Sequence, residues 1–105
     1  MDKYRLNFSG VTGAVGIHEV IMNGLEFPEY YGANTDALWD CMTDMLGDPT
    51  EIEIVGFENV KKQFAEEWSG IMRIMQRVRH AYSDKYLSSF VIYLIHKDGS
   101  REELK

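Results

Sequence analysis

Three aspartates recur at intervals of four residues near the middle of the chain: Asp36, Asp40 and Asp44. If this segment is helical, the spacing places the three carboxylates on one face, with Thr43 beside them. Like charges at this spacing destabilise an isolated helix by roughly a few tenths of a kcal/mol, and no Lys or Arg lies nearby in the sequence to offset them. Such a row of carboxylates could bind a divalent cation, exchange protons in acid–base catalysis, or contact a basic partner.

Catalysis and metal binding are the weaker of these interpretations. Asp36 and Asp40 form the pattern D-x-x-x-D, which is a very weak signal for metal binding or acid–base catalysis. Cys41 falls on the apolar side of the same segment, which disfavours a reactive thiol. The histidines have no nucleophile or ligand partner near them in the sequence: His18, His80 and His96. We therefore expect no enzymatic activity, no bound metal ion and no cofactor.

Aromatic side chains beside the aspartates favour the third interpretation, a surface that binds a protein. Tyr30, Tyr31 and Trp39 flank the acidic residues, and the residues that dominate protein interfaces are enriched in Tyr, Trp and Arg. We expect one of the two tyrosines to be buried and to hold its loop in place. Two simpler interpretations stay open: Trp39 could lie at the edge of the core, and basic residues of the last helix could pair with the aspartates.

The charge of the chain is divided between its two halves. Its 105 residues carry 17 acidic and 11 basic side chains, for a net charge of -6. No Lys or Arg lies between Arg5 and Lys61, and that stretch contains ten acidic residues. This balance argues against direct binding to a nucleic-acid backbone, which requires clustered Lys and Arg. It suits a protein whose acidic surface attracts a cationic partner.

Length and composition indicate a single domain over residues 1–105. The hydrophobic fraction of 45% and the charged fraction of 27% are those of a globular protein. One cysteine cannot form an internal disulfide, and no apolar segment has the length of a secretory signal or a membrane span. We expect a soluble cytoplasmic protein that does not bind membranes.

The hydrophobic pattern predicts an α/β fold in which a small three-stranded parallel sheet packs against about four helices. Apolar residues alternate or run continuously in the predicted strands, at residues 4–8, 50–55 and 90–95. They recur at helical spacing in the predicted helices, at residues 16–26, 34–46, 59–67 and 69–82. Asn34 is a suitable N-cap for the acidic helix, and the charged residues after position 95 are expected to form a tail.

Residues 25–43 carry a more specific signal. Their sequence, LEFPEYYGANTDALWDCMT, is similar to the signature segment of the barstar family, whose members inhibit ribonucleases of the barnase type. The similar segment covers about a fifth of the chain, and the predicted order of helices and strands agrees with the family over most of the remainder. The resemblance implies a three-stranded parallel sheet with helices, a protein that is not an enzyme, and a small basic ribonuclease as the partner.

The resemblance also implies roles for individual residues. By the family's mechanism, Asp40 would enter the nuclease active site, where the RNA phosphate normally lies among Arg, Lys and His side chains. Asp36 would meet a neighbouring basic residue. The other implied contacts lie on the same helix or in the loop before it: Tyr30, Asn34, Trp39, Thr43 and Asp44. A carboxylate held in this way would block the substrate without any reaction by the inhibitor.

Three positions depart from the family pattern. Met45 stands where the family has a second tryptophan at the contact edge, and Asp44 stands where it has a glycine. Arg77 in the last helix aligns with an acidic residue that the family offers to the nuclease, so we expect it to repel a basic cleft. These differences concern the target, and they leave a second hypothesis open: an acidic protein–protein interaction module whose basic partner is not a nuclease.

Overall fold

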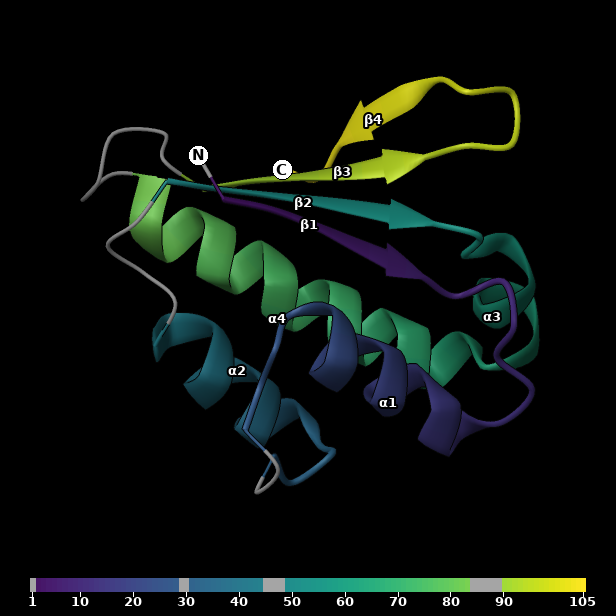
Figure 1. The fold of residues 1–105 in the computed structure, drawn as a ribbon, viewed down its shortest axis with the longest axis horizontal. Coiled ribbons are helices and arrows are strands. Elements are labelled where there is room, and N and C mark those ends of the chain that lie inside the picture. The colour runs from purple at the N-terminus through teal and green to yellow at the C-terminus, as the bar shows by residue number, and fades with distance from the viewer. Residues whose placement is uncertain (1, 29–30, 45–48, 84–89) are drawn as a thin grey trace.

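The chain alternates strands with helices, as its hydrophobic pattern predicts. The computed structural model describes residues 2–28, 31–44, 49–83 and 90–105 (Figure 1). In chain order, its helices and strands are β1 (Asp2–Asn7), α1 (Ala14–Gly24), α2 (Thr35–Asp44), β2 (Thr50–Val55), α3 (Glu58–Gln63), α4 (Ala65–Ser83), β3 (Phe90–Ile95) and β4 (Arg101–Glu103). None of the described helices is long and apolar enough to cross a membrane.

The sheet has the strand order β1-β2-β3-β4. β1, β2 and β3 pair in parallel, in a register that aligns Leu6 with Ile54 and Ile54 with Leu94. The predicted parallel sheet is therefore confirmed. β3 lies between β2 and β4, which is the central position that its continuous apolar sequence favours.

The fourth strand corrects the expectation of a three-stranded sheet followed by a charged tail. β4 pairs antiparallel with β3 after a turn in which Gly99 has a φ of 87°. The backbone N–H of Leu104 donates to the Ile92 carbonyl at 2.8 Å, and the Leu104 side chain is buried in the core. β4 itself consists of Arg, Glu and Glu. It forms through backbone pairing and shows no apolar alternation from which a strand could be predicted.

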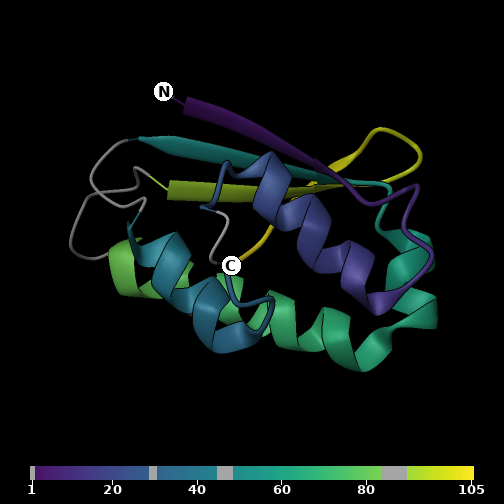
Figure 2. The same cartoon turned by 60° about the horizontal axis from the view of Figure 1, so that its bottom comes forward.

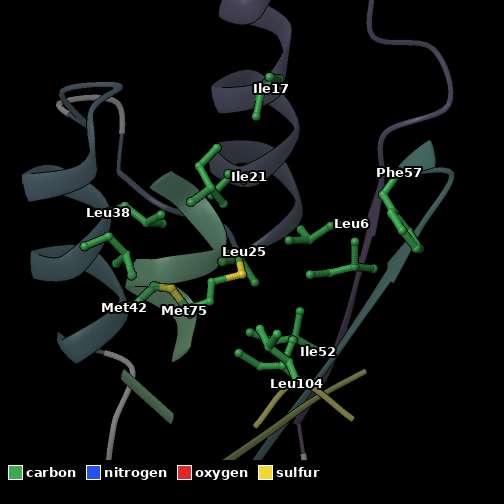
Figure 3. Close-up of a cluster of buried hydrophobic side chains, with 14 of the residues drawn as sticks. Leu6, Ile17, Ile21, Leu25, Leu38, Met42, Ile52, Phe57, Met75 and Leu104 are labelled. Atoms are coloured by element: carbon green, nitrogen blue, oxygen red, sulfur yellow. The ribbon is translucent and has the colours of Figure 1, made fainter. Parts of the chain in front are cut away.

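The helices lie on one side of the sheet, as Figures 1 and 2 show from two directions. α1 packs on β1, α4 packs on β3, and α2 packs against α4. The core between these layers is apolar, and Figure 3 shows part of it, with side chains from the helices and the sheet that include Leu6, Ile17, Ile21, Leu38, Met42, Ile52 and Met75. On the other side of the sheet, the alternate residues of each strand are exposed or half-buried.

The helical region after β2 breaks at a different residue from the one predicted. We expected helices over residues 59–67 and 69–82, but the interruption falls at Phe64, which has a φ of −127° and a ψ of 55°. Trp68 therefore lies within α4, where it is buried and stacks on Phe57 with 5.9 Å between the ring centroids. No Gly or Pro marks this position, so the sequence offers no local signal for the break.

Candidate protein-docking site

The acidic helix α2 begins where its sequence predicts. Oδ1 of Asn34 accepts a hydrogen bond from the Ala37 N–H at 2.8 Å, and its Nδ2 donates one to the Gly32 carbonyl at 3.2 Å. Ala33, just before this cap, adopts a left-handed backbone conformation with a φ of 53°. The cap pairs a backbone donor that the first helical turn would leave unpaired, and it ties the start of α2 to the preceding loop.

Tyr31 anchors the same loop to α1. Its ring is buried, with 8% of its surface exposed, and packs on Phe27, while its hydroxyl shares a hydrogen bond of 2.8 Å with Nδ1 of His18. Burial, with a further contribution from the charge of Cys41, raises the pKa of Tyr31 to about 12, and burial lowers the pKa of His18. Both side chains are therefore neutral at pH 7. The expectation of one buried tyrosine is met by Tyr31; Tyr30 lies outside the described residues.

The inward side of α2 is apolar. Leu38 and Met42 are fully buried in the core (Figure 3), and Cys41 is half-buried beside them. Burial raises the pKa of the Cys41 thiol, and the charges of Asp44 and Asp40 raise it further. The thiol is therefore protonated at neutral pH, as expected for a cysteine that is not reactive. The buried contacts fix the rotation of α2 and so determine which side chains point outward.

The outward side of α2 presents its carboxylates to solvent. Asp36, Asp40 and Asp44 are all exposed, and no ion pair between described residues includes any of them. Thr43 is half-buried, and its hydroxyl donates to the backbone carbonyl of Asp40 at 2.9 Å. The predicted acidic row is present, and within the part of the chain that the structure describes no basic side chain neutralises it. Met45 lies outside that part.

Two arginines of α4 have contacts other than the aspartates of α2. Arg79 forms an ion pair with Glu103 of β4, at 3.6 Å. Arg77 lies over Trp39 of α2, with its guanidinium carbon 4.9 Å from the ring centroid. At an exposed site, such a cation–π contact contributes about 0.5–1 kcal/mol. Trp39 is half-buried and packs on the core, so it lies at the core edge and supports Arg77 at the same time.

The contact between Arg77 and Trp39 is the part of the site that the sequence analysis missed. It forms because α2 and α4 lie side by side and run in the same general direction (Figure 1). The helices approach closely at Gly70, where an added Cβ would lie 3.5 Å from Cγ2 of Thr35. Arg77 lies about two turns further along α4 and faces Trp39, one turn into α2. A glycine inside a helix can indicate a neighbouring helix, but a Cβ at Gly70 would make only an ordinary van der Waals contact, so the signal is weak.

Two other kinds of site have less support. Among the described residues, no group of three or more His, Cys, Asp or Glu side chains is placed to hold a metal ion. An open hollow of about 710 Å³ lies beside the start of α1 and is lined in part by glycines spaced G-x-x-G-x-x-G. Its one basic lining residue, Arg5, is paired with Glu53 at 3.1 Å, and Glu19 adds a negative charge. The hollow therefore does not favour a phosphate group.

Comparison with known proteins places the chain in a family. A sequence model of the family described as Barstar (barnase inhibitor) matches residues 1–95. The chain belongs to the barstar family. The protein named "Putative ribonuclease inhibitor YrdF" of Bacillus subtilis (strain 168) is 29% identical to it over 70 residues, which are 67% of this chain and 77% of that protein. Membership of the barstar family indicates a ribonuclease inhibitor rather than an enzyme, with a ribonuclease as the partner.

The match to the barstar family ends at residue 95, the last residue of β3. β4 and the buried Leu104 lie beyond the matched residues, although they complete one edge of the sheet. α2 and α4 both lie within the matched residues.

Proposed function

We propose that this member of the barstar family inhibits a small, basic, barnase-like ribonuclease by laying the outward face of α2 over the nuclease active site. Asp40 takes the place of an RNA phosphate, and Asp36 meets a neighbouring basic side chain. The proposed contact surface is completed by Tyr30, Asn34, Trp39, Thr43 and Asp44. In this proposal the chain acts as a single domain in the cytoplasm and uses no cofactor.

The unpaired carboxylates of α2 carry this proposal. Asp36 and Asp40 are exposed one turn apart, and neither forms an ion pair with a described residue. The Asn34 cap and the buried Leu38 hold the helix in place, so the backbone that carries the carboxylates is already ordered. Groups that are already ordered lose less conformational entropy on binding, which favours affinity.

A carboxylate resembles a phosphate group in its charge and in its hydrogen-bond acceptors. It can accept charge-assisted hydrogen bonds from the Arg, Lys and His side chains that bind the phosphate of RNA. Inhibition then needs no chemical step, because the inhibitor and RNA compete for one site and the complex dissociates reversibly. Opposite charges on the two proteins accelerate association, so the association rate is expected to fall as ionic strength rises.

Cleavage of RNA by barnase in the presence of the purified protein tests the proposal. We expect stoichiometric inhibition that is weakened by more than about 30-fold in Asp40→Asn, equivalent to about 2 kcal/mol, the usual threshold for a residue that dominates an interface. Glu102→Gln is a control for net charge, because it removes one negative charge from β4, which lies across the sheet from α2 (Figure 1). Glu102 lies 2.8 Å from Nε2 of His96, and the Gln amide keeps a hydrogen-bonding group at that position. Urea unfolding should show that both variants remain folded.

Each outcome has a distinct meaning. Equal inhibition by the wild type and Asp40→Asn would contradict the role of Asp40. Equal losses of inhibition in Asp40→Asn and Glu102→Gln would show that only the net charge of the protein matters. Binding to barnase without loss of its activity would favour the second hypothesis, an acidic interaction module that does not occupy an active site. Absence of binding at micromolar concentrations would contradict a barnase-like target.

A further inference from the structure

Arg77 is an exposed cation of α4 that contacts the acidic helix α2, and Arg73 is exposed one turn earlier on α4. It reaches from α4 onto Trp39 of α2, with its guanidinium carbon 4.9 Å from the ring centroid. Arg77 is exposed and forms no ion pair with any residue that the structure describes. Because Trp39 directly precedes Asp40 on α2, a protein that contacts Asp40 through an interface of ordinary size also covers Arg77.

The contact with Trp39 prepares Arg77 to bind a carboxylate. A guanidinium that lies over an aromatic ring keeps the N–H groups at its edge available, and their planar arrangement matches the two oxygens of a carboxylate. The ring also restricts the motion of the arginine side chain before binding. Less conformational entropy is then lost when an acceptor arrives.

A second pair of this kind shows how such a cation is satisfied within the chain. Arg101 lies over the Tyr93 ring, with 4.1 Å between its guanidinium carbon and the centroid, and it also reaches Glu51 at 3.5 Å and Glu53 at 3.4 Å. Arg77 has the ring but no carboxylate among the described residues. A partner that covered Arg77 with basic side chains alone would bury a cation without a counter-charge, which is unfavourable.

We infer that Arg77 is a specificity-determining residue: the ribonuclease that this chain inhibits carries an Asp or Glu at the rim of its basic active site, facing Arg77. The inference rests on the proposed binding of a ribonuclease through α2, and it narrows the identity of that partner. A nuclease with a rim that is basic throughout is selected against, because its cations would face Arg77 at contact distance.

A panel of barnase variants measures this preference. Each residue that borders the barnase active-site cleft is replaced singly by Glu, and affinities are measured for the wild-type chain, Arg77→Gln and Arg77→Glu. We expect at least one Glu variant of barnase to bind the wild-type chain about tenfold more tightly than unmodified barnase does, a difference of about 1.4 kcal/mol. The gain should vanish with Arg77→Gln and become a loss with Arg77→Glu.

Lys62→Glu is the matched control for net charge. It makes the same change of charge on α3, which lies at the opposite end of the helical layer from α2 (Figure 1). The affinities of Lys62→Glu for the barnase variants should follow the same order as those of the wild-type chain. If no barnase variant distinguishes the Arg77 substitutions from the Lys62 control, Arg77 lies outside the contact and the inference is wrong.

Asp40→Asn in the same panel separates failure of the inference from failure of the proposed function. If Asp40→Asn lowers affinity while the Arg77 variants leave the ranking unchanged, binding through α2 stands and the inference about Arg77 falls. If Asp40→Asn has no effect either, the nuclease does not bind through α2 and the proposed function falls first. A wild-type chain that binds no member of the panel overturns both.

Discussion

Glu51 and Glu53 on the sheet and the aspartates of α2 both form acidic rows, but only the row on the sheet is surrounded by basic side chains. Glu51 lies 3.8 Å from Lys3 and 3.5 Å from Arg101. Glu53 lies 3.1 Å from Arg5 and 3.4 Å from Arg101. The two glutamate side chains are only 14% and 24% exposed, so their charges are satisfied within the chain and partly shielded from solvent.

The aspartates of α2 have no such neighbours among the described residues. Two arginines of α4 have other contacts: Arg79 pairs with Glu103, and Arg77 lies over Trp39. Exposed like charges one turn apart cost the isolated protein a little stability, because they repel each other. The contrast shows that an acidic row paired inside the chain stabilises the fold, whereas an unpaired row is available to a partner.

The largest effect on folding stability should come from removing the ion pairs of Glu51 and Glu53. The double variant Glu51→Gln/Glu53→Gln loses four ion-pair contacts, and exposed pairs contribute about 0.2–1 kcal/mol each. We expect the free energy of unfolding in urea to fall by about 1–3 kcal/mol, while the affinity for ribonuclease stays unchanged. A loss of affinity without a loss of stability would reverse the roles assigned to the two rows.

The inward half of the site was predictable because it depends on residues close together in the sequence. Apolar spacing places Leu38 and Met42 in the core, and the preference for Asn at a helix start identifies Asn34 as the cap. The bounds of β2 and β3 agree with the prediction for the same reason. The acidic spacing within residues 34–46 also predicts correctly that the aspartates share an exposed face.

The features that the sequence did not predict depend on contacts between distant segments. Arg77 and Trp39 meet only because α2 lies along α4. β4 forms through backbone pairing with β3, and its three charged residues give no pattern. The helix break at Phe64 accompanies the stacking of Trp68 on Phe57. Periodicity and spacing report only the local preference of the chain. In each of these cases tertiary contacts override that preference.

Removal of the α2 cap should have a smaller effect, and it should act on both stability and binding. Asn34→Ala loses the acceptor for the Ala37 N–H, and such substitutions cost about 0.5–2 kcal/mol. Because the cap also positions the start of the proposed interface, inhibition of barnase should weaken in the same variant. Urea unfolding and titration of RNA cleavage measure the two effects.

Two further variants separate the cap from a general effect of substitution. Asn34→Asp keeps the side-chain acceptor, so it should retain most of the stability. Asn23→Ala changes an exposed residue of α1 and should alter neither stability nor inhibition. If Asn23→Ala is as harmful as Asn34→Ala, the loss does not come from the cap.

The smallest expected effect is a gain in folding stability, opposite in sign to the loss expected for Glu51→Gln/Glu53→Gln. Asp44 is the last residue of α2, where the helix dipole disfavours negative charge, and Asp40 precedes it by one turn. The double variant Asp40→Asn/Asp44→Asn removes this repulsion, so we expect the free energy of unfolding at low salt to rise by about 0.5 kcal/mol.

Salt tests the difference between the aspartates of α2 and the paired glutamates Glu51 and Glu53. Screening weakens both the repulsion between the aspartates and the attraction between the glutamates and their basic partners. Between about 0.1 M and about 1 M salt, the screening length falls from about 10 Å to about 3 Å. The gain in Asp40→Asn/Asp44→Asn should therefore shrink, and so should the loss in Glu51→Gln/Glu53→Gln, when urea unfolding is measured at both concentrations. If the aspartate variant loses stability instead, its carboxylates have a partner inside the chain. The difference between the two rows would then no longer explain why α2 is available to bind a ribonuclease.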